Sequence, residues 1–167
     1  MEERVILVDE ADREIGTQEK LVAHKEGALH RAFSVFVLDK DGRLLLQRRA
    51  ADKYHSAGLW SNTCCGHPRP GEEALDAARR RLREEMGFDC PLEPIGAFVY
   101  RAKLANGLVE HEYDHVFAGA FDGEPVPDPV EVSEWRGVAV DEIVTELRRQ
   151  RARYTVWFKP ALDTVLQ

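Results

Sequence analysis

A glycine- and proline-rich turn that runs directly into a charged helix constrains this 167-residue chain more than any other feature. The turn covers residues 62–72, Asn-Thr-Cys-Cys-Gly-His-Pro-Arg-Pro-Gly-Glu, and holds two adjacent thiols and an imidazole. Apolar residues then recur at spacings of three and four from Leu75 to Met86, which predicts a helix over 72–86. Gly87 follows as the expected C-terminal cap. Metal-ligand, thiol and anion-binding chemistry is therefore concentrated in one turn–helix unit.

Short apolar and alternating runs separated by turn residues predict the remaining elements. Strands are expected over 5–8, 29–38, 43–49, 95–101, 108–121 and 135–140, and helices over 141–151 and 158–166. The tetrapeptide at 39–42, Asp-Lys-Asp-Gly, predicts a hairpin that makes the second and third strands partners. A short helical turn from Thr17 is expected to carry Lys20 and His24. This mixture predicts an α+β sandwich with flanking helices, in a single domain over 1–167.

Composition excludes several functional classes. The formal net charge is −7 and no long lysine/arginine block occurs, which argues against a nucleic-acid partner but leaves room for a small anionic substrate. The sequence shows neither a secretory signal nor the roughly 20 consecutive apolar residues that cross a bilayer. The three cysteines, an odd number, are expected to be reduced thiols. We therefore expect a cytoplasmic protein without a membrane partner.

Two groups of polar side chains are candidates for chemistry. Glu110 and Glu112 lie two apart on a predicted strand and so share one face. Together with three histidines they have the ligand types that bind Mg²⁺, Mn²⁺ or Zn²⁺; these histidines are His24, His30 and His67. Taken singly, each histidine is more often a surface or satisfied core residue, and spacing alone does not assemble the set.

The charged helix resembles the Nudix box. The pattern runs from Gly66 through Glu72 to Arg80 and then reads Arg81-Leu82-Arg83-Glu84-Glu85-Met86-Gly87-Phe88. Arg81 departs from the box, which has a glutamate there. Replacing a metal carboxylate by a cation weakens the case for hydrolysis and favours direct diphosphate binding by the guanidinium. The plainer interpretation is a surface helix laced with ion pairs, which the fixed spacing makes the weaker one.

Nearly the whole chain, from about residue 5 to 160, resembles the type 1 isopentenyl-diphosphate isomerases. The resemblance rests on the Cys65-Gly66-His67-Pro68 core and on Glu110-His111-Glu112. It implies a Nudix fold and the 1,3-allylic rearrangement of isopentenyl diphosphate to dimethylallyl diphosphate in isoprenoid biosynthesis. Protonation and deprotonation would proceed through a tertiary carbocation. The alternatives are a Nudix diphosphohydrolase acting on a nucleoside or prenyl diphosphate, and a non-catalytic binding protein of the same fold.

The resemblance also implies residue roles. Cys65 and Glu112 would be the acid/base pair, assisted by Tyr100. One divalent metal, Mn²⁺, Mg²⁺ or Zn²⁺, would be held by His24, His30, His67, Glu110 and Glu112. A Mg²⁺ that accompanies the substrate diphosphate would be held by Glu85 and the Cys65 carbonyl. The expected diphosphate-binding residues are Lys20, Arg49, Lys53 and Arg81. Cys64 and Cys90 would only pack, Trp60 and Trp157 are pocket-wall or core aromatics, and the protein would be a monomer or weak homodimer.

Overall fold

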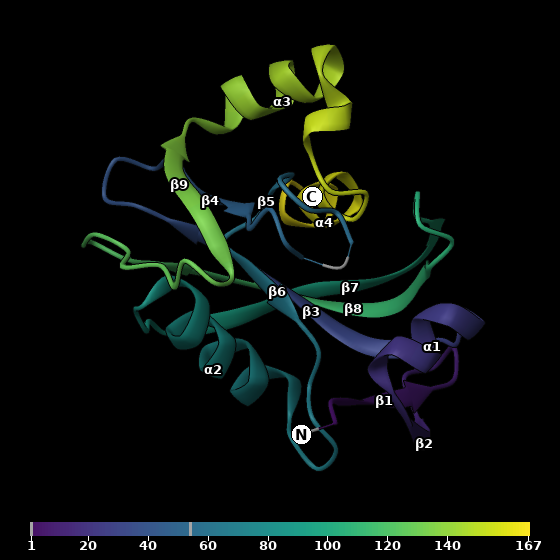
Figure 1. Cartoon of the computed structure of the whole chain (residues 1–167). Helices are drawn as coiled ribbons and strands as arrows, with labels where there is room; N and C mark the ends of the chain where they lie inside the picture. Colours follow the sequence, from purple (N-terminus) through teal and green to yellow (C-terminus); the bar gives the residue numbers. More distant parts are fainter. Residues whose placement is uncertain (1, 54) are drawn as a thin grey trace.

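The computed structural model describes residues 2–53 and 55–167, and it shows strands interleaved with helices along the chain (Figure 1). The strands are β1 Arg4–Val8, β2 Glu14–Glu19, β3 His30–Leu38, β4 Leu44–Arg49, β5 Trp60–Ser61, β6 Cys64–Gly66, β7 Leu92–Lys103, β8 Val109–Ala120 and β9 Val132–Val138. The helices are α1 Lys20–Glu26, α2 Ala74–Met86, α3 Val140–Arg149 and α4 Phe158–Val165, and a 3₁₀ turn spans Arg151–Arg153. The expected α+β class is confirmed.

Strand β3 lies at the centre of the fold. It pairs in parallel with β8 along its whole length and antiparallel with β6 and β1. Its alternate side chains face opposite layers: Phe33 packs in the core cluster that contains α2, and Phe36 packs in the one that contains α3 and α4. The two helix layers therefore cover opposite sides of the sheet, as Figure 1 shows. Burial on both faces explains why β3 is an almost continuous apolar run.

The predicted hairpin forms only at its turn. Gly42 adopts a left-handed conformation with φ 76°, and the Asp39 amide donates to the Arg43 carbonyl. Beyond the single pair Leu38–Leu44, however, β3 and β4 separate, and β4 pairs with β9 and β5 instead. The expectation of partner strands is wrong beyond the turn, because both strands bury two faces and each acquires neighbours of its own. Both strands contribute to the wall of one cavity, β3 through Phe33 and β4 through Arg49.

The N-terminal segment also differs from expectation. Residues 17–19 belong to strand β2, which pairs antiparallel with β1, and helix α1 begins only at Lys20. The helix carries Lys20 and His24 as expected and ends at Gly27, whose φ is 70°. Cross-strand pairing with β1 is the reason that the start of the helix is delayed, and this pairing is invisible to local pattern.

Helix α2 begins at Ala74, two residues later than predicted, and ends at Gly87 with φ 72°, so the predicted cap is confirmed. Ala78, Leu82 and Met86 are buried, whereas Leu75 is 37% exposed. Glycine is required at position 87 for two reasons. Its positive φ disfavours a side chain, and a Cβ there would also lie 2.2 Å from the Val126 carbonyl oxygen. Within the described residues, the structure contains no helix with the length and apolar character that crossing a membrane requires.

Candidate active site

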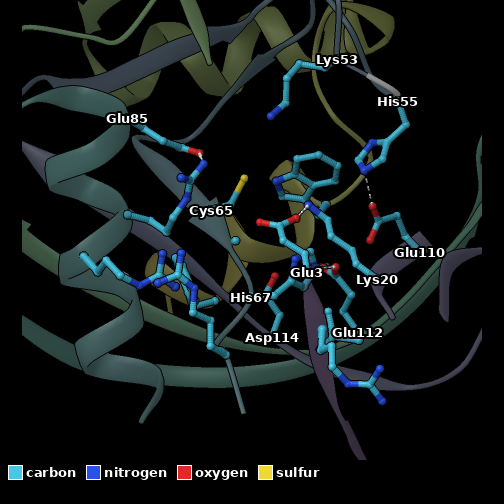
Figure 2. A pocket seen from close by; sticks show the side chains of 18 of the residues that line it. Glu3, Lys20, Lys53, His55, Cys65, His67, Glu85, Glu110, Glu112 and Asp114 are labelled. Carbon is cyan, nitrogen blue, oxygen red and sulfur yellow. Dashed lines mark hydrogen bonds and ion pairs between the residues drawn. The ribbon is translucent and has the colours of Figure 1, made fainter. Parts of the chain in front are cut away.

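A cavity of about 520 Å³ opens between β3, β4, β6 and β8, and most of the residues that line it are polar or charged (Figure 2). One side holds His55, the His67 imidazole that follows β6, and carboxylates of β8, with Lys20 of α1 nearby. The other side holds Glu85 and the Arg81 guanidinium of α2. The N-terminal residues Glu2–Val5 contribute to the wall.

Five predicted metal ligands that are far apart in the sequence come together on the first side of the cavity. The ligand atoms of His24, His30, His67, Glu110 and Glu112 all lie within 4.8 Å of one another and could hold a metal ion. Parallel pairing of β3 with β8 sets His30 beside Glu112, and alternation along β8 puts Glu110 on the same face. Helix α1 brings His24, which is buried, to the same point. The structure therefore assembles the set that spacing alone does not.

The hydrogen bonds of two histidines fix which ring nitrogen faces the centre. His24 Nδ1 donates to the Lys20 carbonyl at 2.7 Å, and His30 Nδ1 donates to the Ala28 carbonyl at 2.8 Å. Each Nε2 then faces a carboxylate oxygen 3.3 Å away, on Glu110 and Glu112 respectively. A buried contact of this kind needs a proton or a metal ion between the nitrogen and the oxygen. The three imidazoles and two carboxylates have the ligand types that fit a divalent metal.

Glu112 is the most connected side chain of the cavity. Its Oε2 accepts from His67 Nε2 at 2.7 Å, and its Oε1 accepts from the Tyr100 hydroxyl at 2.6 Å. Burial opposes its charge, but the His67 charge and the imidazole hydrogen bonds outweigh burial and hold the Glu112 pKa well below its usual range. Burial and the Glu112 charge raise the Tyr100 pKa well above normal. Glu112 is thus a carboxylate, and Tyr100 retains its proton.

Cys65 faces the same cavity from β6, where it pairs with Ser34 of β3. Burial raises the pKa of its thiol to about 12, with a lowering contribution from Arg49 and raising contributions from Glu85 and Glu112. The side chain is therefore a neutral thiol at physiological pH, which suits a group that carries a proton. Cys64, its neighbour, is fully buried and packs in the core cluster beside α2.

The four predicted diphosphate-binding residues all line the cavity, and three of them already contact carboxylates. Lys20 Nζ lies 3.2 Å from Glu3, and Lys53 Nζ lies 2.5 Å from Glu131. Arg81 contacts Glu85 at 2.6 Å and Glu131 at 3.5 Å. Arg49 instead lies over the Trp157 ring, with its guanidinium carbon 5.4 Å from the ring centroid. The sequence reasoning found these cations but none of Glu3, Glu131 or their pairings.

Glu85, the predicted ligand for a substrate-bound Mg²⁺, is similarly engaged. Its Oε1 accepts from Gln47 at 3.0 Å, and its Oε2 accepts from Arg81 at 2.6 Å. The carboxylate is buried at 5% exposure on the inner edge of α2. Arg81 and Glu85, four residues apart on α2, are therefore ion-pair partners beside the core.

Sequence reasoning missed two further cavity residues. His55, in the loop between β4 and β5, contacts Glu110 Oε1 through its Nε2 at 2.9 Å. Asp114, two residues beyond Glu112 on the same strand face, accepts from the Ser34 hydroxyl at 2.9 Å. Burial and the Glu112 charge raise the Asp114 pKa well above normal. The alternation along β8 was a signal for Asp114, whereas His55 sits in an irregular loop that gave none.

The two tryptophans that were candidates for the pocket wall lie in different parts of the structure. Trp157, at the start of α4, lines the cavity, whereas Trp60 packs in the core cluster with α3 and α4. Arg136 stacks on Trp60, with its guanidinium carbon 4.5 Å from the ring centroid. Cys90 is buried in the cluster around α2, so it packs as expected.

Comparison with known proteins identifies the class. A NUDIX domain matches residues 28–158, and the chain belongs to that family. The crystal structure of a Deinococcus radiodurans protein has a TM-score of 0.75 at 20% identity, covering 89% of this chain and 90% of that one. A MutT NUDIX hydrolase from Burkholderia pseudomallei has a TM-score of 0.63 at 24% identity, covering 82% and 98%. At these identities the likeness concerns the fold alone, and the expected Nudix fold is confirmed.

Curated relatives narrow the class to one family. The isopentenyl-diphosphate Delta-isomerase of Burkholderia multivorans is 59% identical over 158 residues, covering 95% of this chain and 90% of that protein. Isopentenyl-diphosphate Delta-isomerase 2 of Aromatoleum aromaticum is 57% identical over 166 residues, covering 99% and 88%. The chain belongs to the isopentenyl-diphosphate Delta-isomerase family. The resemblance noted from the sequence and the assignment as an isomerase are confirmed.

Proposed function

We propose that this cavity moves the double bond of isopentenyl diphosphate to give dimethylallyl diphosphate. The reaction adds a proton to the terminal alkene carbon and removes one from the carbon on the other side of the branch point. The cation between these steps is tertiary. Two proton-transfer groups facing a flat alkene are needed, in a pocket that shields the cation from water.

Cys65 and Glu112 suit the two proton-transfer positions. The Cys65 thiol holds a proton that it can give to one carbon, and the Glu112 carboxylate can accept the proton that leaves the other carbon. The Tyr100 hydroxyl keeps its own proton and donates a 2.6 Å hydrogen bond that orients Glu112. The Trp157 ring in the cavity wall presents a π-face of the kind that stabilises carbocations. This set of groups, rather than any one of them, favours proton transfer at carbon.

The metal site is assigned to His24, His30, His67, Glu110 and Glu112. A divalent ion held there would neutralise the two carboxylates and tune the proton affinity of Glu112. The ligand types admit Mn²⁺, Mg²⁺ or Zn²⁺. A second ion, Mg²⁺ carried in with the diphosphate, would bind Glu85 and the Cys65 carbonyl. Lys20, Arg49, Lys53 and Arg81 would bind the diphosphate oxygens, which guanidinium and ammonium groups recognise well.

One observation carries the proposal. The Cys65 thiol shares a cavity with the five residues that could hold a metal ion. Glu112 is one of these five, and it also accepts the hydrogen bond from the Tyr100 hydroxyl. Diphosphate hydrolysis would not need this combination. It needs metal carboxylates on the Nudix helix, where Arg81 replaces one and contacts another, Glu85. The hydrolase alternative is therefore not favoured.

The test is incubation of the protein with isopentenyl diphosphate and Mg²⁺. Isomerisation yields dimethylallyl diphosphate, which acid decomposes, whereas hydrolysis releases phosphate. A binding protein gives neither product. Phosphate release without an acid-labile product would overturn the proposal and restore the hydrolase.

A further inference from the structure

The carboxylate of Glu110 has two oxygens in different situations. Oε1 lies 2.9 Å from His55 Nε2 and 3.3 Å from His24 Nε2. Oε2 is buried and has no hydrogen-bond partner among the described residues. A partial rotation of the carboxylate would turn its oxygens away from the other ligands, and a hydrogen bond at Oε1 opposes that rotation. His55 makes the shorter of the two contacts at Oε1.

The His55 ring is itself held from several directions. Its centroid lies 5.6 Å from that of His24 and 6.0 Å from that of Trp157, which it meets edge to face. Its Nδ1 lies 3.1 Å from the Ser56 hydroxyl oxygen, and the Arg49 guanidinium donates to its backbone carbonyl at 3.3 Å. The side chain is 6% exposed. The imidazole is therefore fixed before any ligand arrives.

The backbone beside His55 is strained. Ser56 has φ 53°, a left-handed conformation that costs a residue with a Cβ about 1 kcal/mol. Figure 2 shows the His55 side chain above Glu110 at the edge of the cavity, where the two are in contact. Strain of this kind persists where the surrounding contacts hold it.

We propose that His55 is a positioning residue for the metal site. Its Nε2–H donates to Glu110 Oε1 and holds the carboxylate in the orientation that binds the ion. Groups that hydrogen-bond metal ligands in this way set ligand orientation, and their loss typically weakens metal binding by about 10- to 100-fold. The inference rests on the proposed metal role of the histidine and glutamate set, and it adds a residue from the loop after β4 to that set.

The experiment measures metal affinity in the absence of substrate. Metal-free protein is titrated with Mn²⁺ and with Zn²⁺ in competition with a chromophoric chelator. His55→Phe keeps a ring against Trp157 and removes the donor, so we expect affinity to fall by about 10- to 100-fold. His55→Gln can present an amide N–H near the former Nε2 position and should recover most of the affinity. If His55 only filled space in the fold, the presence of an N–H donor would not matter, and His55→Gln would not bind metal more tightly than His55→Phe.

His115→Phe is the matched control, because His115 lies on the same strand as Glu110 but pairs with Asp12 at 2.8 Å and does not line the cavity. It should bind metal as the wild type does. If His55→Phe does not fold, His55→Asn serves in its place, since its amide is too short to reach Glu110. Equal metal affinity in wild type and a folded donor-less variant overturns this inference alone. A wild-type protein that binds neither ion overturns the proposed metal site as well.

Discussion

The two ends of the cavity differ in how the charges of their side chains are balanced. At the β8 end, Glu110 and Glu112 face the imidazoles of a buried cluster whose ligand atoms lie within 4.8 Å of one another and could hold a metal ion. At the α2 end, Arg81 and Lys53 share carboxylate partners in Glu85 and Glu131. The first end is prepared for an incoming positive ion. The second is already neutralised and must exchange partners before it can bind an anion.

This difference indicates which end of the cavity must change its side-chain contacts when the substrate diphosphate binds. The histidine and glutamate cluster is rigid, because each imidazole is anchored by its own hydrogen bond or by packing. The arginine and lysine cluster keeps some access to solvent, with the Lys53 and Glu131 side chains 20% and 24% accessible. A diphosphate with its Mg²⁺ would therefore compete with Glu131 for these cations when it binds.

Metal removal should have the largest effect. Without an ion, the lone pairs and carboxylates of the β8 end face one another, so turnover should be lost and should return when metal is restored. At a free concentration about 100 times its Kd, the ion should add about 2.7 kcal/mol to the free energy of unfolding. Activity and thermal melting of stripped and reloaded protein measure both effects. Full activity in protein shown by elemental analysis to be metal-free would contradict the assignment.

Substitution of the proton-transfer groups comes next. Cys65→Ala and Glu112→Gln should each lower kcat by about 10²- to 10⁴-fold, the usual contribution of a general acid or base. Circular dichroism should show both variants folded. Cys64→Ala is the control, because that thiol packs in the core and its loss should leave kcat nearly unchanged. Near-normal turnover by Cys65→Ala, or inactivity of Cys64→Ala alone, would show that the wrong thiol was chosen.

The protonation of Cys65 provides a test by pH. With a pKa of about 12 against an ordinary value of 9.0, its thiolate fraction at pH 8 is about 10³-fold below that of a free thiol. Alkylation by iodoacetamide should be correspondingly slow and should rise steeply above pH 9, as followed by mass spectrometry with glutathione as the reference. The raised pKa means that the folded state holds the proton more tightly. This contribution to stability is therefore present below pH 9 and is lost as pH rises from 9 toward 12. Rapid labelling of Cys65 at pH 8 would contradict a neutral thiol.

The smallest effect concerns the exchange of partners at the α2 end. Glu131→Gln removes a carboxylate that competes with the diphosphate for Lys53 and Arg81, so KM should fall by about threefold, within the range of exposed ion pairs. Arg81→Leu should raise KM by about 10-fold, since a hydrogen bond to a charged group contributes about 1.5–3 kcal/mol. Steady-state kinetics on both variants would sharpen the comparison. If Glu131→Gln raises KM, then Glu131 assists binding and the α2 end is not self-neutralised.

The fold was predictable wherever a signal was local. The cap at Gly87, the apolar side of α2 and most strands followed from residue spacing and turn chemistry. Pairing was not predictable in the same way. The turn at 39–42 indicated a hairpin, but nothing in it shows that β4 would leave β3 for β9. The β2 strand likewise owes its existence to β1 rather than to its own polar sequence.

The site residues that belong to a sequence motif could be predicted, and those outside any motif could not. The cysteine, histidine and glutamate positions followed from the family pattern, and the structure brings them together. His55 and Glu131 lie in irregular segments and acquire their importance only through contacts with Glu110 and with Lys53 and Arg81. Local periodicity contains no record of such contacts. The remaining expectations, on residue roles, oligomeric state and cellular location, stay predictions.

The parallel register of β3 with β8 has a consequence for how the protein acquires its metal. The proposed ligands span residues 24 to 112, and His30 meets Glu112 only after strands 82 positions apart have paired. Long-range pairing of this kind is slow because its loop-closure entropy must be paid first. Before it forms, the chain holds only parts of the proposed set, such as Glu110 with Glu112. All five proposed ligands are therefore available together only in the folded chain, and binding that needs the whole set is coupled to folding.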